Sequence, residues 1–208
     1  MLALASAFSV GLVVLRYALS GHVSYANMIW NLVLAWAPLV FALAAYDRHR
    51  RGRDGLPLAL LLALWLAFLP NAPYLATEFK MLRQVQDMPI WFDVAMVTSF
   101  AWTGLVLAFV SVYLVQEIAR RVRGPLFGWA CAIGSFGLCG IGVYLGRYVR
   151  LNSWDLFLRP HGVLAQVASR LESARLVGMS LLIASFLTMA YAMLYTVLEA
   201  AVAERERP

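Results

Sequence analysis

The chain has 208 residues, of which 62% are hydrophobic and only 13% are charged. A soluble domain usually carries about a quarter charged residues, and several apolar runs here approach or exceed the roughly 20 residues that cross a bilayer core. The composition therefore excludes an ordinary soluble domain. The net charge of +6 comes from arginines at the ends of apolar runs, not from a basic stripe with interleaved aromatic residues, which argues against a nucleic-acid partner.

The apolar runs predict an all-α polytopic membrane protein with about six transmembrane helices in a single integral membrane domain, residues 1–208. The expected spans are 2–19, 27–46, 56–70, 90–116, 126–147 and 176–200. The first run lacks a basic leader, and Arg16 stands where a cleavage region would need small residues, so we expect a retained helix rather than a signal peptide.

Charge density in the short connections predicts the orientation. Residues 47–55 and 117–125 together contain seven arginines. With six spans, both connections lie on the same side as the two termini. The positive-inside rule then predicts cytoplasmic termini.

The longer connections predict less regular structure on the outer face. The third run ends in Pro70-Asn71-Ala72-Pro73-Tyr74, whose prolines predict a helix break at Pro70, with Asn71 turned inward toward Asp93 or Arg147. A polar connection, 78–89, follows. After the fifth run, Asn152 and Asp155 resemble the N-cap and N3 residues of a short interfacial helix at 153–158. Residues 163–171 have the apolar face of a second, amphipathic one.

Polar residues within the spans fall at a similar expected depth, near the outer ends of five helices. They are Arg16, Asn27, Asn31, Asn71, Asp93, Arg147 and Arg150. Uncompensated charge in a bilayer is costly, so we expect Arg147 to pair with Asp93 or Asp155, and Arg16 with a carboxylate. Arg150, nearer the headgroups, is expected to face a ligand. Each residue also has a purely structural explanation, such as an arginine that extends to lipid phosphate or an aromatic belt that includes Tyr74.

Three segments, LPNAPYL at 69–75, WFD at 91–93 and GRYVRLNSWD at 146–155, resemble the family called domain of unknown function 1361. The resemblance covers roughly residues 27–200, with the motifs in the same order. It implies a bacterial multi-pass protein of the inner membrane and no established activity. It also singles out the motif positions Asn71, Asp93, Arg147, Arg150, Asn152 and Asp155.

Three hypotheses for function stay open. The first is that the outer polar site, with candidate residues Arg16, Asn31, Asn71, Tyr74, Asp93, Arg147, Arg150, Asn152 and Asp155, binds or moves an anionic amphiphile such as a membrane lipid. The second is an enzyme acting on a phosphate-bearing lipid, with arginines holding phosphate and Asp93 or Asp155 as general base. The third is a structural subunit that meets a membrane-protein partner through the glycine-rich fifth helix. No cofactor is indicated, and the three scattered histidines indicate no metal site.

Overall fold

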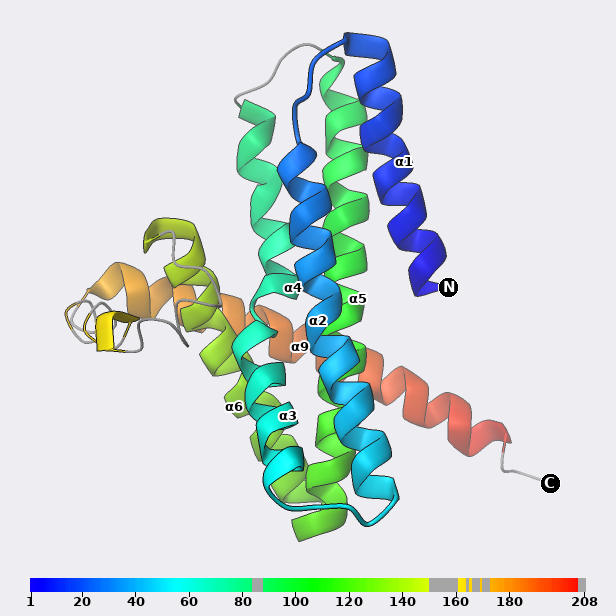
Figure 1. The fold of residues 1–208 in the computed structure, drawn as a ribbon, viewed down its shortest axis with the longest axis vertical. Coiled ribbons are helices and arrows are strands. Elements are labelled where there is room, and N and C mark those ends of the chain that lie inside the picture. Colours follow the sequence, from blue (N-terminus) through cyan, green and yellow to red (C-terminus); the bar gives the residue numbers. More distant parts are fainter. Residues whose placement is uncertain (84–87, 150–160, 164, 166–168, 170–172, 206–208) are drawn as a thin grey trace.

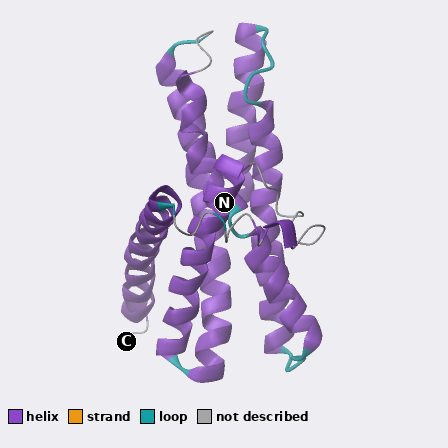
Figure 2. Ribbon diagram, turned by 90° about the vertical axis from the view of Figure 1, so that its left-hand side faces the viewer, coloured by secondary structure: helices purple, strands orange, loops and turns teal. Residues whose placement is uncertain are grey.

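The computed structural model describes residues 1–83, 88–149, 161–163, 165, 169 and 173–205. Within these residues the chain is helical and contains no strand (Figures 1 and 2). Six helical segments are long and apolar enough to cross a membrane, as the sequence predicts: Leu2–Ser20, Ala26–Arg50, Leu56–Leu82, Ile90–Arg123, Pro125–Val149 and Ala174–Ala200. The fold is therefore all-α and polytopic. The two predicted interfacial helices lie largely or wholly outside the described residues.

The helix α5 (Ile90–Arg123) is the centre of the bundle. Its 34 residues correspond to a length of about 51 Å, and it is the most buried of the six spans. It packs against α1 (Leu2–Ser20), α2 (Ala26–Arg50), the broken third span and α6 (Pro125–Tyr144). Every other element that carries a candidate site residue is thus placed relative to α5 or to a neighbour of α5.

Two helices extend further than their apolar runs predict. The helix α2 continues to Arg50 and α5 to Arg123, so the expected connection 117–125 is largely helical and the connection 47–55 is helical over its first four residues. Salt bridges across one helical turn, such as Glu117 to Arg121, favour this extension, and cations are stabilised at a helix C-terminus. The segment after α2 and the turn at Gly124 lie at the same end of the bundle (Figure 1).

The third span changes its helical form instead of ending. The helix α3 (Leu56–Phe68) is followed by α4 (Asn71–Tyr74) and a 3₁₀ helix, η1 (Leu75–Arg83). Pro70 and Pro73 have no N–H to donate, yet the residues around them keep right-handed helical dihedral angles. The expected break near Pro70 is present, but the predicted polar connection from residue 78 is wrong, because the span continues and Glu78 is only 3% exposed.

Small residues allow the broken span to lie close to its neighbours. A side chain at Gly104 of α5 would overlap the carbonyl oxygen of Ala72, and one at Gly142 of α6 would overlap the ring of Pro70. The proline-containing segment is therefore held between α5 and α6. The glycine-rich helix α6 is predicted to contact a membrane-protein partner, but some of its glycines pack against other segments of the same chain.

The helix α9 (Ala174–Arg205) lies to one side of the bundle and crosses it obliquely (Figures 1 and 2). It packs mainly along α6, where Gly140 directly faces the backbone of Ser180. Further along, Tyr191 is buried among aromatic rings and donates a hydrogen bond to Gln116 of α5. This buried bond fixes α9 against the central helix.

Candidate functional site

A fully buried ion pair joins Arg16, about one turn before the end of α1, to Asp93 in the first turn of α5. Arg16 Nε lies 2.8 Å from Asp93 Oδ1 and its Nη2 lies 3.3 Å from Oδ2, while the two residues are 0% and 1% exposed. The hydroxyl of Tyr25 donates to Asp93 Oδ2 at 3.3 Å, and the guanidinium carbon of Arg16 is 4.9 Å from the centre of the Tyr25 ring. Since it is closed to the surroundings, this group is suited to holding helices together.

A second arginine–carboxylate pair joins the end of the α6 span to the broken third span. Arg147 lies in a π-helical segment, η2 (Leu145–Val149), and its Nη1 is 3.5 Å from both Glu78 Oε1 and the hydroxyl of Tyr74. Asn31 Nδ2 of α2 donates to the same Glu78 oxygen at 3.3 Å. The guanidinium also lies 5.8 Å from the centre of the Tyr74 ring.

The two pairs differ in tightness and access. Charge-assisted N–H···O bonds are usually about 2.7–2.9 Å long; the Arg16 pair reaches this range, whereas the contacts of Arg147 are longer. The side chain of Arg147 is 16% exposed, against 1% for Arg16. A guanidinium has five N–H donors, and among the described residues the hydrogen bonds of Arg147 use Nη1 alone. Toward the part of the chain that the structure describes, Arg147 therefore keeps donors for another acceptor.

The backbone around Arg147 is irregular on both sides of the pair. Arg147 stands in a π-helical turn and Glu78 in a 3₁₀ helix. Short π-helical segments are rare and are often found at functional sites. At membrane depth, irregular backbone is tolerated where it is buried in protein or lines a polar cavity. This local geometry, together with the two charges, makes the group Asn31–Tyr74–Glu78–Arg147 the candidate functional centre.

The structure divides the predicted site residues between these two groups. Arg16 pairs with Asp93, whereas Asn31 and Tyr74 gather with Arg147. The expected Arg147–Asp93 pair is wrong, because Arg16 occupies both oxygens of Asp93 and Arg147 faces Glu78. Asn71 donates its amide to the carbonyl oxygen of Phe68 at 3.0 Å. Arg150, Asn152 and Asp155, with the expected Arg147–Asp155 pair, lie outside the described residues.

Glu78 is the member of the candidate centre that the sequence interpretation left out. Its spacing from Tyr74, four residues, places both on one face if the chain stays helical. The prolines at 70 and 73 instead indicated a helix end, so Glu78 was assigned to a polar connection. Tyr25 was missed as well, because the short turn that positions its hydroxyl against Asp93 leaves no pattern in the sequence.

The described residues contain no group of three or more histidine, cysteine, aspartate or glutamate side chains placed to hold a metal ion. What the candidate centre offers chemically is a partly accessible guanidinium, a neighbouring carboxylate and two neutral hydrogen-bonding side chains. A guanidinium in this setting recognises carboxylate or phosphate oxygens through paired N–H donors. An acceptor that reaches it must share it with Glu78.

Fold and site together define a multi-pass α-helical membrane protein with an intramembrane arginine–carboxylate centre. Residues 30–190 match the family model described as protein of unknown function (DUF1361), and the chain belongs to that family. No curated protein and no solved structure matches the chain. The matched range includes Asp93 and the whole Arg147 centre, whereas Arg16 and Tyr25 precede it.

Proposed function

We propose that this integral membrane protein binds the headgroup of an anionic amphiphile at Arg147. The supporting observation is the contrast between its two arginine–carboxylate pairs. The pair at Arg16 is tight and closed, whereas Arg147 is partly exposed and its contacts with the described residues are long and use one of its nitrogens. A structural ion pair inside a membrane is stable only with close geometry and satisfied hydrogen bonds. Arg147 has room for a further acceptor.

The neighbours of Arg147 suit a headgroup that enters from the bilayer. Tyr74 lies beside the guanidinium and offers a hydroxyl, and Asn31 and Glu78 complete a polar wall within otherwise apolar helices. Glu78 lies 3.5 Å from Arg147 and so balances its charge when no headgroup is bound. A phosphate or carboxylate would engage the remaining donors of the guanidinium.

We further propose that the two arginine-rich segments face the cytoplasm of a bacterium, with the protein in the inner membrane. Both segments lie at the same end of the bundle, away from the turn after α1 (Figure 1). Arginines clustered beside span ends are retained on the cytoplasmic side. The Arg147 centre would then be reached from the opposite leaflet.

The test is a comparison of ligand-induced stabilisation in purified protein. Short-chain phosphatidic acid should raise the melting temperature of the parent protein, because a ligand that binds only the folded state stabilises it by mass action. Short-chain phosphatidylcholine, whose headgroup is zwitterionic, should raise it less. Arg147→Lys keeps the charge but loses the planar fork, and should abolish most of the difference between the two lipids.

Arg121→Lys is the matched control. Arg121 is half-exposed, and it lies in the last turn of α5 among the arginine-rich residues, not in the Arg147 centre. That variant should keep the full response to phosphatidic acid. Equal responses of the parent and Arg147→Lys would disprove the proposed site. If the added lipid is instead converted to a product by the parent but not by Arg147→Lys, the centre belongs to an enzyme rather than to a binding protein.

A further inference from the structure

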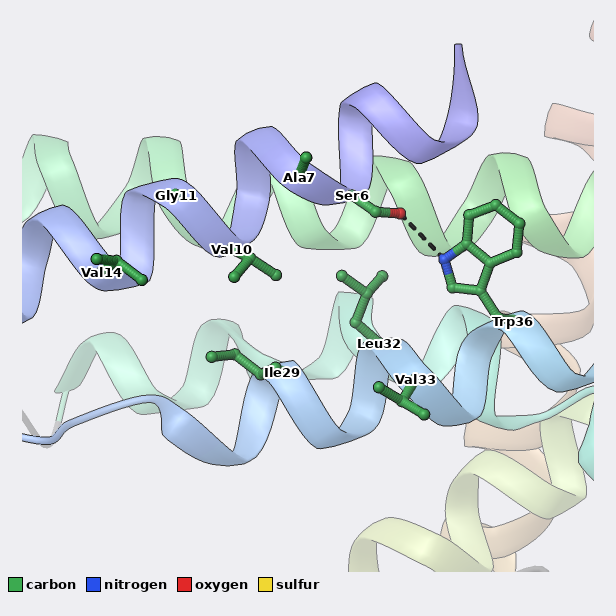
Figure 3. Close-up of a pocket in the computed structure, with 9 residues that line it drawn as sticks. All are labelled: Ser6, Ala7, Val10, Gly11, Val14, Ile29, Leu32, Val33 and Trp36. Atoms are coloured by element: carbon green, nitrogen blue, oxygen red, sulfur yellow. Dashed lines mark hydrogen bonds between the residues drawn. The ribbon is translucent and has the colours of Figure 1, made fainter.

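An apolar groove runs between α1 and α2, on the outside of the bundle (Figure 3). It forms because α1 packs chiefly against α5 and makes few contacts with α2. Its volume is about 530 Å³, within the range of small-molecule pockets. Ala7, Val10, Gly11 and Val14 form one wall, and Ile29 and Val33 stand on the other.

The chemistry of the groove excludes a polar occupant. Its polar side-chain groups are the indole N–H of Trp36 and the hydroxyl of Ser6, and these are hydrogen-bonded to each other at 3.1 Å across one end of the groove. No charged residue lines it. An occupant is therefore held by apolar contact alone, which suits a hydrocarbon chain.

The position of the groove also fits the hydrocarbon core of the bilayer. Both walls are spans, and they run side by side along the groove (Figure 3). From Val14 to Ser6 the α1 wall extends about 12 Å, out of the roughly 30 Å of hydrocarbon in the bilayer. It begins about 9 Å from the helix end at Ser20. The groove therefore lies about 9–21 Å from that end, in the middle of the hydrocarbon core, where the distal parts of lipid chains lie parallel to it.

The groove is separate from the Arg147 centre. The groove-lining residues of α2 lie about 150° around the helix from Asn31, which faces Glu78. On α1, Gly11 and Val14 face the groove, whereas Arg16 faces α5. A chain in the groove therefore does not belong to a headgroup held by Arg147, and the inference does not depend on the proposed function.

We propose that the α1–α2 groove is a binding site for one hydrocarbon chain of a bilayer phospholipid. Gly11 leaves the space for it: a Cβ placed there meets nothing within 4 Å. The chain lies between two helices and so contacts more apolar surface than a chain on a convex helix face. It fills the opening that α1 leaves beside α2.

The experiment uses the full chain in phosphatidylcholine vesicles that contain a phosphatidylcholine with a mid-chain diazirine. After irradiation, mass spectrometry maps the labelled residues. Labelling within 6–14 and 29–36 should exceed labelling around Gly134 of α6 and Gly178 of α9 several-fold, although both of those glycines are exposed and open. Uniform labelling of all exposed spans would overturn the proposal, because the groove would then bind no chain specifically.

Gly11→Leu should reduce labelling of the groove several-fold, because Gly11 lines the groove and a Cβ placed there meets nothing within 4 Å, so the new side chain can extend into it. Gly134→Leu, the same change at an open position on α6, should leave groove labelling unchanged. Ala7→Leu, one turn from Gly11 on the same wall, should also reduce labelling of the groove. It provides a second groove variant in case Gly11→Leu fails to fold. Unchanged labelling in both groove variants would overturn the proposal. Disulfide-linked dimers of Gly11→Cys formed in place of lipid labelling would overturn it too, by assigning the groove to a second copy.

Discussion

Arg16 and Asp93 are 77 positions apart in the chain, yet their side chains meet at 2.8 Å where the C-terminal part of α1 packs on the first turn of α5, and both are almost completely buried. This pair fixes the first span, which precedes the matched family range, to the most buried helix of the bundle. The Arg147–Glu78 pair has the same chemistry in an open setting. The difference in setting is what separates a structural role from the proposed binding role.

Asp93→Asn should destabilise the protein, because it leaves the buried Arg16 cation facing a neutral amide. Removing one partner of a buried ion pair typically costs about 3–5 kcal/mol. The double variant Arg16→Met with Asp93→Asn should recover much of that loss, since replacement of both charges is often close to neutral. Thermal unfolding in detergent measures both variants. Equal destabilisation by the single and double changes would contradict the coupling.

Glu78→Gln should strengthen binding of an anionic headgroup. The change removes the carboxylate that competes for Arg147 but keeps an oxygen for Asn31 and for the guanidinium. Phosphatidic acid should then give a larger rise in melting temperature than it does in the parent protein. Glu117→Gln, a carboxylate at the opposite end of α5, is the control and should not change the response. A weaker response in Glu78→Gln would mean that Glu78 positions Arg147 for the ligand instead of competing with it.

Gly104→Ala should destabilise the fold, because the added methyl group overlaps the carbonyl oxygen of Ala72. Overpacking of this kind typically costs about 1–3 kcal/mol. Gly134→Ala adds the same group to α6 where nothing lies within 4 Å, and alanine favours a helix over glycine. The melting temperature should therefore fall for the first variant and stay level or rise for the second. An equal change in melting temperature for both variants would show that the close approach at Gly104 contributes little to stability.

Tyr191→Phe should loosen α9 from α5, because it removes the hydroxyl that bonds the buried Gln116. An unsatisfied buried polar group costs about 1–3 kcal/mol. Tyr113→Phe is the matched control, since Tyr113 is 41% exposed. Hydrogen exchange in α9 should rise in Tyr191→Phe and not in the control. Similar exchange in both would assign the attachment of α9 to its ring contacts instead.

The orientation predicts the activity of fused reporters. Alkaline phosphatase, which is active only in the periplasm, should be active when it is inserted between Arg83 and Met88. It should be inactive when it is fused after Ala203. The reverse pattern would place the arginine-rich segments outside and move the Arg147 centre to access from the inner leaflet.

The sequence by itself determined the class of protein and the number of spans. Long apolar runs can be buried only in lipid, and their count is a local property of the chain. The motifs at 69–75, 91–93 and 146–155 were also sufficient to indicate the family, and Asp93 and Arg147 were identifiable as charges that a bilayer does not tolerate alone.

The tertiary structure alone decided which charges meet. Arg16 and Arg147 both required a carboxylate, and nothing in their local sequence distinguishes Asp93 from Glu78 as a partner. The choice follows from packing: α1 lies along α5, which gives Asp93 to Arg16. The proline-containing third span stays helical because Gly104 and Gly142 let it lie between α5 and α6. Because the span continues past the prolines, Glu78 lies next to Arg147. Contacts between helices, and not the prolines, determine where this segment runs.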